Sequence, residues 1–405
     1  MTVWIQITVL FTLSSQLYFV RSETRQETEK RILHQIFQKY DPSIRPSGKN
    51  GSGPVIVKVN TFVRSINNID DVKMEYETQL TFRQAWMDER LKYNDRGLNY
   101  VTVTRPEKLW IPDLFFRNEK SGHFHNIITP NNLLRIFPNG EVLYSTRISL
   151  KLFCPMDLQN YPLDQQICSI SCASYGYTTE DLIFLWKEDN PIQMAQNVYL
   201  AKFNLYKYET DNCTSRTATG EYSCLKLDFF FSRHFIYFLE RAYLPTAALV
   251  FLSWITFWLN PRSTAIRLGI WVGILVSIII VNTSIIASMP QVSFTKAIDV
   301  WMGMCVCFVF CVLIELCLVN NANASDERLE LPNLSADERK DAMLHNFTTV
   351  PLRWLNKYST KGQRIDAISR FLFPAAFAFF NFVYWLKYTS ILRKHEQTTE
   401  QRQHH

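Results

Sequence analysis

Four long apolar segments in the second half of the chain constrain its fold more than any other feature. Each lacks Asp, Glu, Lys and Arg over a stretch that, with its apolar continuation, is long enough to cross a bilayer as a helix. We therefore expect a membrane protein with four spanning helices, three in residues 242–319 and the fourth in residues 366–392. The uncharged segments are Ala242–Pro261, Leu268–Thr295, Val300–Ile314 and Phe371–Leu386.

The first residues indicate that the amino-terminal half is exported. Thr2–Val20 are apolar and precede the small residue Ser22, a pattern typical of a cleaved secretory signal peptide over residues 1–22. With the mature amino terminus outside, four crossings leave residues 320–365 as a cytoplasmic linker and residues 393–405 as an extracellular tail.

Residues 23–241 have the pattern of an antiparallel β-sandwich. Short runs such as Val55–Arg64 and Lys73–Arg83 alternate polar and apolar residues, and turn sequences such as Pro138-Asn-Gly140 separate them. A helix over Glu27–Lys39 is expected before these strands. The predicted fold is an α+β membrane protein, an extracellular antiparallel β-sandwich followed by a four-helix transmembrane bundle.

The composition narrows the classes of function. Hydrophobic residues make up 47% of the chain and aromatic residues 14%, which excludes disorder, and the formal charge of +6 is spread too evenly to indicate nucleic-acid binding. No glycine-rich nucleotide loop, nucleophile elbow or cluster of metal ligands occurs, so we expect neither an enzyme nor a cofactor. Two sequons on the exported side, at Asn50 and Asn212, are candidate glycosylation sites.

Five of the nine cysteines lie in the exported half, where an oxidising compartment favours disulfides. The sequence alone allows several pairings among these five. Cys154 and Cys168 enclose 13 residues, Cys213 and Cys224 enclose ten, and Cys172 would then be a buried thiol. The other four cysteines lie in the third apolar segment and are expected to be packing residues.

The run Cys154-Pro-Met-Asp-Leu-Gln-Asn-Tyr-Pro-Leu-Asp…Cys168, a β-rich exported half and four membrane segments together resemble the Cys-loop family of pentameric ligand-gated ion channels. Within that family the chain is similar to the invertebrate glutamate-gated chloride channels, over roughly residues 30–320 and again over Ile365–Trp385. The resemblance implies the disulfides Cys154–Cys168 and Cys213–Cys224. The strings that carry it are Pro54-Val-Ile-Val-Lys-Val-Asn60, Trp110-Ile-Pro-Asp-Leu-Phe-Phe116, Asn118-Glu-Lys120, Gly122-His-Phe-His-Asn-Ile-Ile128, Ala173-Ser-Tyr-Gly-Tyr177, Thr219-Gly-Glu-Tyr-Ser-Cys-Leu225 and Lys296-Ala-Ile-Asp-Val-Trp301.

This resemblance implies a site for L-glutamate between neighbouring subunits. One face supplies arginines and a hydroxyl group for the carboxylates, and the other supplies an aromatic box with polar partners for the ammonium group. The residues that match the first face are Arg64, Arg83 and Ser149. The residues that match the second face are Phe115, Ser174, Tyr175, Thr219 and Tyr222.

Other functions fit parts of the same pattern. An amine such as GABA or histamine would use the aromatic box and need fewer cations. His123 and His125 stand two apart on an expected strand and could bind zinc or respond to protons, although ordinary loop histidines have the same spacing. An accessory subunit with poor conduction of its own, and a membrane-anchored adhesion protein, are further alternatives; an adhesion protein would need only one span.

The resemblance places the pore on the second apolar segment, aligned without gaps from Lys296. Arg267 then matches a basal arginine at the cytoplasmic mouth, where positive charge favours anions, and Arg262 lies nearby. Trp271 falls off the pore-facing stripe and is expected to pack against a neighbouring helix or lipid. The expected stripe is Gly269, Gly273, Val276, Ile280 and Ser284.

The pore segment is also where the chain departs most from this group. The relatives carry hydroxyl residues at the first two stripe positions, which are glycines here, and their Pro-Ala-Arg is Ala265-Ile-Arg267. We therefore expect little or no glutamate current from this subunit alone, and a contribution to mixed pentamers. Macrocyclic lactones bind members of the family beside a small residue, a position that Gly303 matches.

The resemblance also implies how ligand binding reaches the pore. The Cys154–Cys168 loop would contact the connection Ser288–Phe294, and Pro245 would kink the first membrane helix. The implied partners are L-glutamate, chloride, membrane lipid and related subunits of a homo- or hetero-pentamer. The implied location is a postsynaptic plasma membrane.

Overall fold

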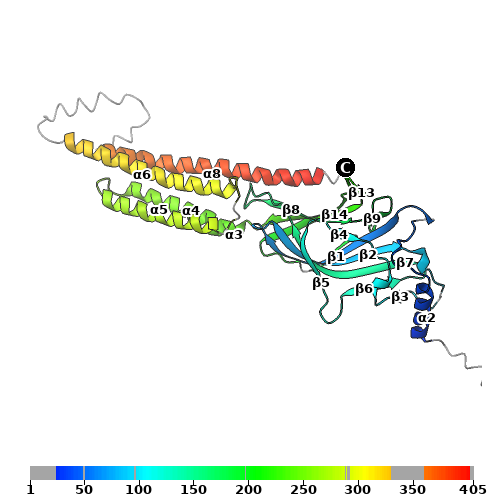
Figure 1. Cartoon of the computed structure of the whole chain (residues 1–405). Coiled ribbons are helices and arrows are strands. Elements are labelled where there is room, and N and C mark those ends of the chain that lie inside the picture. The colour runs from blue at the N-terminus through cyan, green and yellow to red at the C-terminus, as the bar shows by residue number, and fades with distance from the viewer. Residues whose placement is uncertain are drawn as a thin grey trace, which may run out of the picture.

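The change in polarity near residue 241 divides the molecule into a β-sandwich and a bundle of helices, which lie end to end (Figure 1). The structure, a computed structural model, describes residues 24–48, 51–94, 97–196, 198–287, 289, 292–329 and 360–401. The predicted signal peptide, the sequon at Asn50 and most of the predicted cytoplasmic linker lie outside the described residues. The predicted fold class is confirmed.

Two sheets form the sandwich. The larger has the order β10-β1-β2-β7-β6-β3, with β5 paired to β7 and β9 paired to β1, and the smaller has the order β11-β14-β8-β4. A separate hairpin joins β12 and β13. The strands are β1 Val55–Asp70, β2 Glu75–Met87, β3 Val101–Thr102, β4 Leu114–Phe116, β5 Glu119–Phe124, β6 Asn132–Ile136, β7 Glu141–Phe153, β8 Gln165–Ser174, β9 Leu182–Trp186, β10 Ile192–Met194, β11 Phe203–Asn212, β12 Ser215–Thr217, β13 Gly220–Tyr222 and β14 Cys224–Arg233.

Alternation of side chains builds the core between the two sheets. In β14, Leu225, Leu227, Phe229 and Phe231 are buried, with partly exposed Lys226 among the residues between them. Because successive side chains point to opposite faces of a strand, the other set faces outward and is available to a binding partner. The sites described below use these outward-facing positions.

The expected opening helix is α2 Arg25–Phe37. Thr24 and Glu27 form a capping box at its start, in which each side chain accepts a hydrogen bond from the other residue's backbone N–H. This reciprocal cap explains why the helix starts two residues before the sequence prediction of Glu27.

Four helical segments are long and apolar enough to cross a membrane: Ile236–Trp258, Thr264–Ala287, Ala297–Ser325 and Lys361–Ser390. The first starts before the predicted Ala242, because the helix continues through Glu240 and Arg241 in a π-helical turn. Its parts are α3 Ile236–Phe238, η4 Leu239–Tyr243, α4 Leu244–Ser253 and η5 Trp254–Trp258.

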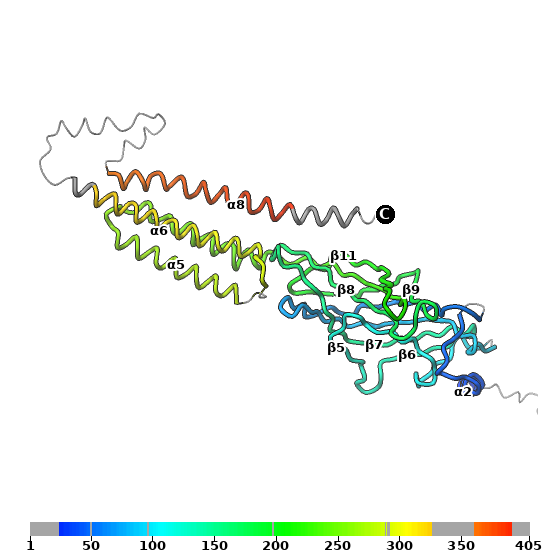
Figure 2. The backbone as a smooth tube through the Cα atoms, turned by 45° about the horizontal axis from the view of Figure 1, so that its top comes forward, coloured from blue at the N-terminus to red at the C-terminus, as the bar shows by residue number. Residues whose placement is uncertain are grey.

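The other three spans are single helices that lie side by side in Figure 2: α5 Thr264–Ala287, α6 Ala297–Leu329 and α8 Lys361–Gln401. The uncharged segment that contains the second span continues to Thr295, but α5 ends at Ala287, before the expected connection Ser288–Phe294. Pro290 follows three residues later, and a proline disfavours the helical conformation of the residue before it.

Candidate functional site

A row of polar and cationic side chains follows one face of the larger sheet. Gln79, Thr81 and Arg83 alternate along β2 and therefore point to the same side. Strand β7 pairs with β2 so that Arg147 lies opposite Thr81 and Ser149 lies opposite Gln79. The expected arginine and hydroxyl positions thus share one surface.

Arg64 reaches this surface from β1 because it alternates with Asn60 and Phe62, which lie opposite Arg83 and Thr81. The pairing of β1 with β2 shifts register between Val63 and Ser65, so Arg64 itself has no paired residue on β2. Its Nε donates a hydrogen bond to Thr81 Oγ1 at 2.7 Å. Burial first, and then the positive charges of Arg147 and Arg83, lower the pKa of Arg64.

Arg83 lies directly opposite Asn60 in the β1–β2 pairing. Its Nη1 donates to Asn60 Oδ1 at 2.8 Å and to Gln193 Oε1 at 3.1 Å. The two arginines that the resemblance selected therefore lie on neighbouring strands and are each held by neutral side chains.

Ser149 is held within a small polar network. Its Oγ lies 2.8 Å from His125 Nε2 and accepts a hydrogen bond from Gln79 Nε2 at 3.3 Å. Arg147 in turn donates to Gln79 Oε1 at 2.6 Å. Arg147, two residues before Ser149, was not among the site residues that the resemblance selected, and His125 was considered only as a possible zinc or proton site.

The rings of His123 and His125 lie 5.4 Å apart, as expected for two histidines on one face. Burial first, and then the charges of Arg147 and His123, lower the pKa of His125. Within the described residues, no three His, Cys, Asp or Glu side chains are grouped so that they could hold a metal ion.

A second group of candidate residues lies on the smaller sheet. Phe115 on β4 and Tyr175, directly after β8, pack edge to face with their ring centroids 5.5 Å apart. Tyr175 is 78% exposed, so its ring is presented to a partner rather than packed in the core. Aromatic faces attract cations, so this pair can bind an ammonium group.

Asp113 holds the loop that carries Tyr175. Its Oδ2 accepts from the backbone N–H groups of Tyr175 at 3.1 Å and Gly176 at 2.6 Å, and its Oδ1 accepts from Ser174 Oγ at 2.8 Å. The Ser174 hydroxyl is buried and donates to Asp113, so in this structure it supports the loop from inside. Asp113 stands within the quoted Trp110–Phe116 string, where its supporting role was not anticipated.

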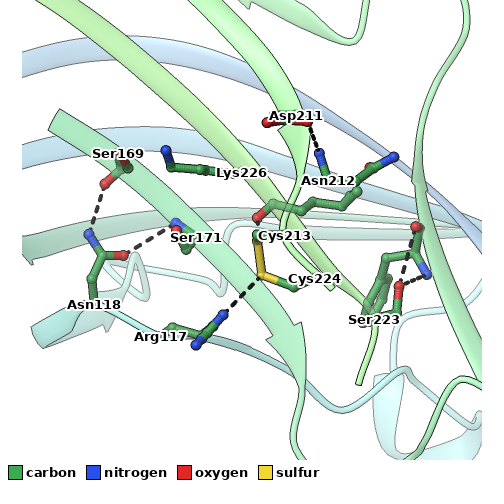
Figure 3. The surroundings of a disulfide bond; sticks show 12 residues. Arg117, Asn118, Ser169, Ser171, Asp211, Asn212, Cys213, Ser223, Cys224 and Lys226 are labelled. Carbon is green, nitrogen blue, oxygen red and sulfur yellow. Dashed lines mark hydrogen bonds between the residues drawn. A yellow bond between two sulfur atoms is a disulfide. The ribbon is translucent and has the colours of Figure 1, made fainter. Parts of the chain in front are cut away.

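The β12–β13 hairpin carries the remaining candidates. The Tyr222 hydroxyl lies 3.0 Å from Thr219 Oγ1, and the Cys213–Cys224 disulfide closes the base with its Cα atoms 4.8 Å apart (Figure 3). Gly220 has φ +146°, and a Cβ there would lie 2.8 Å from Thr178 Cγ2. A glycine thus allows the hairpin to approach the loop after β8.

The two candidate groups lie on different sheets of one chain. Arg64, Arg83 and Ser149 belong to the larger sheet, whereas Phe115 and Tyr175 belong to the smaller sheet. No hydrogen bond or ring contact within the described residues joins one group to the other.

The Cys154–Cys168 loop connects the sandwich with the helices. The structure contains this disulfide, and the carbonyl groups of Gln159 and Tyr161 within the loop accept hydrogen bonds from the N–H groups of Ala297 and Ile298 at 3.0 and 3.2 Å. These bonds lie at the start of α6, just beyond the connection Ser288–Phe294 where contact was expected.

Beside this loop, Arg233 at the end of β14 is buried between two carboxylates. It donates to Asp164 at 2.7 and 2.9 Å and to Asp71 at 2.6 Å. The Arg233 bonds tie the loop to the β1–β2 turn and to the strand that enters the first membrane helix.

The expected pore stripe lies on one exposed face of α5. Val276 and Ile280 are 50% and 60% exposed in the subunit, and Gly269, Gly273 and Ser284 are exposed as well. An added Cβ at Gly269 or Gly273 would meet no atom within 4 Å. This face is therefore free to line a channel shared by several subunits.

The position of Arg267 contradicts the prediction that this residue lies at the pore mouth. Its side chain was expected at the pore mouth, but it is 1% exposed and ion-paired with Asp366 on α8. Since α5 turns by about 100° per residue, Arg267 falls on the buried face that also carries Trp271, Ile274 and Ile278. Its charge is compensated inside the subunit.

Trp271 packs as expected against a neighbouring helix. The indole ring is buried, and its Nε1 donates to the carbonyl oxygen of Val309 on α6 at 2.8 Å. The helix-to-helix hydrogen bond fixes the rotation of α5 and thereby keeps the pore stripe on the opposite face.

Cys172, on β8 of the sandwich, is buried, as predicted.

A β-sandwich with an aromatic and a cationic face, joined through a disulfide loop to four membrane-spanning helices, defines a multi-pass ligand-gated channel subunit. Residues 29–235 match the neurotransmitter-gated ion-channel ligand binding domain, and residues 242–350 match the neurotransmitter-gated ion-channel transmembrane region. The chain belongs to the neurotransmitter-gated ion-channel family.

Two relatives show which branch of the family the chain resembles. It is 47% identical to a glutamate-gated chloride channel of Drosophila melanogaster, over 89% of this chain and 92% of the relative. It is 37% identical to a glutamate-gated chloride channel subunit beta of Haemonchus contortus, over 90% of this chain and 92% of the relative.

Proposed function

We propose that the chain is a subunit of a pentameric chloride channel of the plasma membrane, opened by L-glutamate bound between subunits. The observation that carries this proposal is a set of three arginines, Arg64, Arg83 and Arg147, on one face of the larger sheet. Within the described residues their hydrogen bonds go to neutral side chains, and none of the three arginines forms an ion pair. Their charges therefore remain available to an anionic ligand.

In the proposed complex, the two carboxylates of glutamate bind Arg64 and Arg83, and the Ser149 hydroxyl donates a further hydrogen bond. The ammonium group lies against Phe115 and Tyr175 of the neighbouring subunit. Tyr222 and Thr219 on the β12–β13 hairpin close over the ligand from that side, and Ser174 supports the loop beneath it. Both halves of the site are needed for tight binding.

The channel opens if the β12–β13 hairpin closes over glutamate more favourably in the open state than in the closed state. A ligand shifts the equilibrium between two states only by the difference in its affinity for them. The contact of Gln159 and Tyr161 with the start of α6 supplies a direct path from the sandwich to the membrane helices. Anions then pass along the α5 stripe. Since Arg267 is paired with Asp366, exposed Arg262 at the α4–α5 connection is the proposed source of positive charge at the mouth.

A second candidate function, an accessory subunit in mixed pentamers, is favoured by the pore stripe. Gly269 and Gly273 place no hydroxyl groups at the first two positions of the stripe and reduce helix propensity by about 1 kcal/mol each relative to Ala. Val276 and Ile280 form an apolar girdle above them, which can close the pore by excluding water. We propose that the subunit alone conducts little glutamate-evoked current and that it modulates a conducting partner.

Voltage-clamp recording tests both functions. The chain is expressed alone and with a conducting glutamate-gated subunit, with surface labelling to prove delivery, and glutamate, GABA and histamine are applied in turn. A glutamate-specific change in the chloride current of the mixed channel supports the proposal. Activation by an amine instead would replace glutamate as the ligand, and a large current from the single subunit would refute the accessory role.

A further inference from the structure

Two classes of arginine among the described residues differ in the partners of their guanidinium groups. One class forms short ion pairs with aspartates and serves the fold: Arg45–Asp181, Arg90–Asp88, Arg233–Asp164 and Arg267–Asp366. The other class, Arg64, Arg83 and Arg147, donates hydrogen bonds only to hydroxyl or amide oxygens of the described residues. A carboxylate anchor neutralises a guanidinium group, whereas an amide anchor orients it and leaves its charge in place.

Arg83 shows this amide anchoring most completely. Its Nη1 carries two hydrogens, and it donates to two amide oxygens, Asn60 Oδ1 at 2.8 Å and Gln193 Oε1 at 3.1 Å. Its Nε and Nη2 donate no hydrogen bond within the described residues. These two nitrogens form one edge of the guanidinium fork, which is the edge that can bind a carboxylate with two parallel hydrogen bonds.

The Asn60 amide is itself held in one orientation. Its Nδ2 donates to the backbone carbonyl oxygens of Asn190 at 2.6 Å and Pro191 at 3.2 Å. Since both carbonyl groups accept hydrogen bonds from the same nitrogen, the Asn60 side-chain oxygen must point the other way, toward Arg83. Asn60 is buried, so this orientation is fixed by the strand and by the segment that leads into β10.

Gln193 completes the anchor from β10. That strand runs parallel to β1, with Gln193 opposite Phe62, so its side chain extends over the same surface as Arg83. A cavity of about 380 Å³ opens beside the anchored guanidinium group and is lined by Asn60, Arg83 and Gln193 together with Lys58, Lys187 and the acidic residues Glu141 and Asp189. The cavity is large enough for an amino-acid side chain, and both cationic and acidic side chains line it.

We propose that Asn60 and Gln193 are positioning residues that aim Arg83 at a ligand carboxylate, and that their neutrality determines the preference for an acidic agonist. The inference rests on the proposed function, because it assigns Arg83 to the glutamate site. Neutral anchors keep the fork oriented and fully charged. A carboxylate at either position would occupy Arg83 as an internal ligand and exclude glutamate.

Two variants of one residue separate positioning from structural support. Gln193→Glu keeps an oxygen for the hydrogen bond and adds an ion pair with Arg83, whereas Gln193→Met keeps the length of the side chain and removes the oxygen. A purely structural role predicts that Glu is tolerated better than Met. The proposed role predicts the reverse order for glutamate affinity. Gln35→Glu, an exposed position on α2, adds the same charge away from the site.

The order of glutamate affinities among these variants is measured by equilibrium binding of radiolabelled glutamate to membranes. Surface labelling counts the subunits. We expect glutamate affinity to fall at least about tenfold in Gln193→Glu, by less than about threefold in Gln193→Met, and not at all in Gln35→Glu. Asn60→Asp is expected to resemble Gln193→Glu.

A loss in Gln193→Met equal to or larger than that in Gln193→Glu overturns the inference. The reference variant Arg83→Gln distinguishes that result from failure of the proposed function. If Arg83→Gln binds glutamate normally, or if the unmodified subunit and its mixed channels bind none, the assignment of the glutamate site fails and the inference fails with it. If Arg83→Gln abolishes binding while Gln193→Met loses at least as much glutamate affinity as Gln193→Glu, only the inference fails.

Discussion

Arg267 and Asp366 form a buried, two-pronged ion pair between the pore helix and the last membrane helix. Arg267 Nη1 donates to Asp366 Oδ1 at 3.0 Å and Nη2 donates to Oδ2 at 2.5 Å, while each side chain is 1% exposed. Arg267 Nη2 also donates to the carbonyl oxygen of Leu259 at 2.6 Å. The pair links the start of α5, the end of the first span and the start of α8.

Removing either partner of this pair leaves an unpaired charge inside the bundle, which costs about 3–5 kcal/mol. We expect Asp366→Asn and Arg267→Gln each to reduce the amount of assembled subunit at the cell surface, measured by surface biotinylation. The double variant, which removes both charges, should recover much of that loss. Normal surface expression of Arg267→Gln with altered ion selectivity would instead place Arg267 at the pore.

The glycines of the α5 stripe predict a gain of conduction. Gly273→Thr adds a hydroxyl group at an exposed position where an added Cβ meets no atom within 4 Å, so the subunit can accept it. The hydroxyl group would help to hydrate the pore and contact chloride. We expect the Gly269→Thr, Gly273→Thr double variant to give a larger glutamate-evoked current than the unmodified subunit in whole-cell recording.

Val272→Thr serves as the matched control for this gain, because Val272 is exposed on α5 but lies outside the stripe. It adds the same hydroxyl group and should leave the current unchanged. An equal gain in Val272→Thr would show that the effect does not depend on a hydroxyl group on the stripe, and it would contradict pore hydration as the cause.

A substitution at Gly303 tests whether macrocyclic lactones bind beside this residue. It lies on an exposed face of α6, and an added Cβ there would meet no atom within 4 Å of its own subunit. A bulky side chain should therefore leave the fold intact while filling the space beside a neighbouring subunit. We expect Gly303→Trp to abolish binding of labelled ivermectin, and retained binding would remove Gly303 from the proposed site.

The polar network around Ser149 predicts a dependence on pH. Burial of the ring first, and then the charges of Arg147 and His123, lower the pKa of His125, so the imidazole is neutral at pH 7. Glutamate bound at Ser149, whose Oγ lies 2.8 Å from His125 Nε2, would favour the protonated ring and so take up a proton. Glutamate affinity should therefore rise as the pH falls below about 6.5, the ordinary pKa of histidine.

Glutamate binding between about pH 7.5 and 5.5 measures this effect. His125→Asn should remove the rise, whereas His34→Asn, an exposed histidine on α2, should retain it. A fall in affinity on acidification, or the same rise in His125→Asn, would contradict the linkage.

The sequence was sufficient to predict a β-sandwich followed by four spans, because alternation and uninterrupted apolar runs are local features. The resemblance assigned Arg64 and Arg83 to one face of the site, and in the structure they lie on the paired strands β1 and β2. It also placed Trp271 against a neighbouring helix and Cys172 in the core, and both positions are confirmed.

The partners of these residues could not be predicted in the same way. Asp366 lies 99 positions from Arg267 and Gln193 lies 110 positions from Arg83, and no local pattern records such contacts. The stripe on α5 was counted from Arg267 as its first member. The true phase of the helix, set by Trp271 and by the ion pair, moves Arg267 to the buried face.

Glutamate binding by Arg83 is the central claim, and it can be measured without any current through the pore. Arg83→Gln removes a charge-assisted, two-pronged contact, which costs about 2–4 kcal/mol when the pair is shielded from water. Equilibrium binding of radiolabelled glutamate to surface-expressed subunit, compared between the unmodified chain and Arg83→Gln, is the most direct test. We predict saturable binding that weakens at least about tenfold in the variant. Equal affinity in the two proteins would contradict the account.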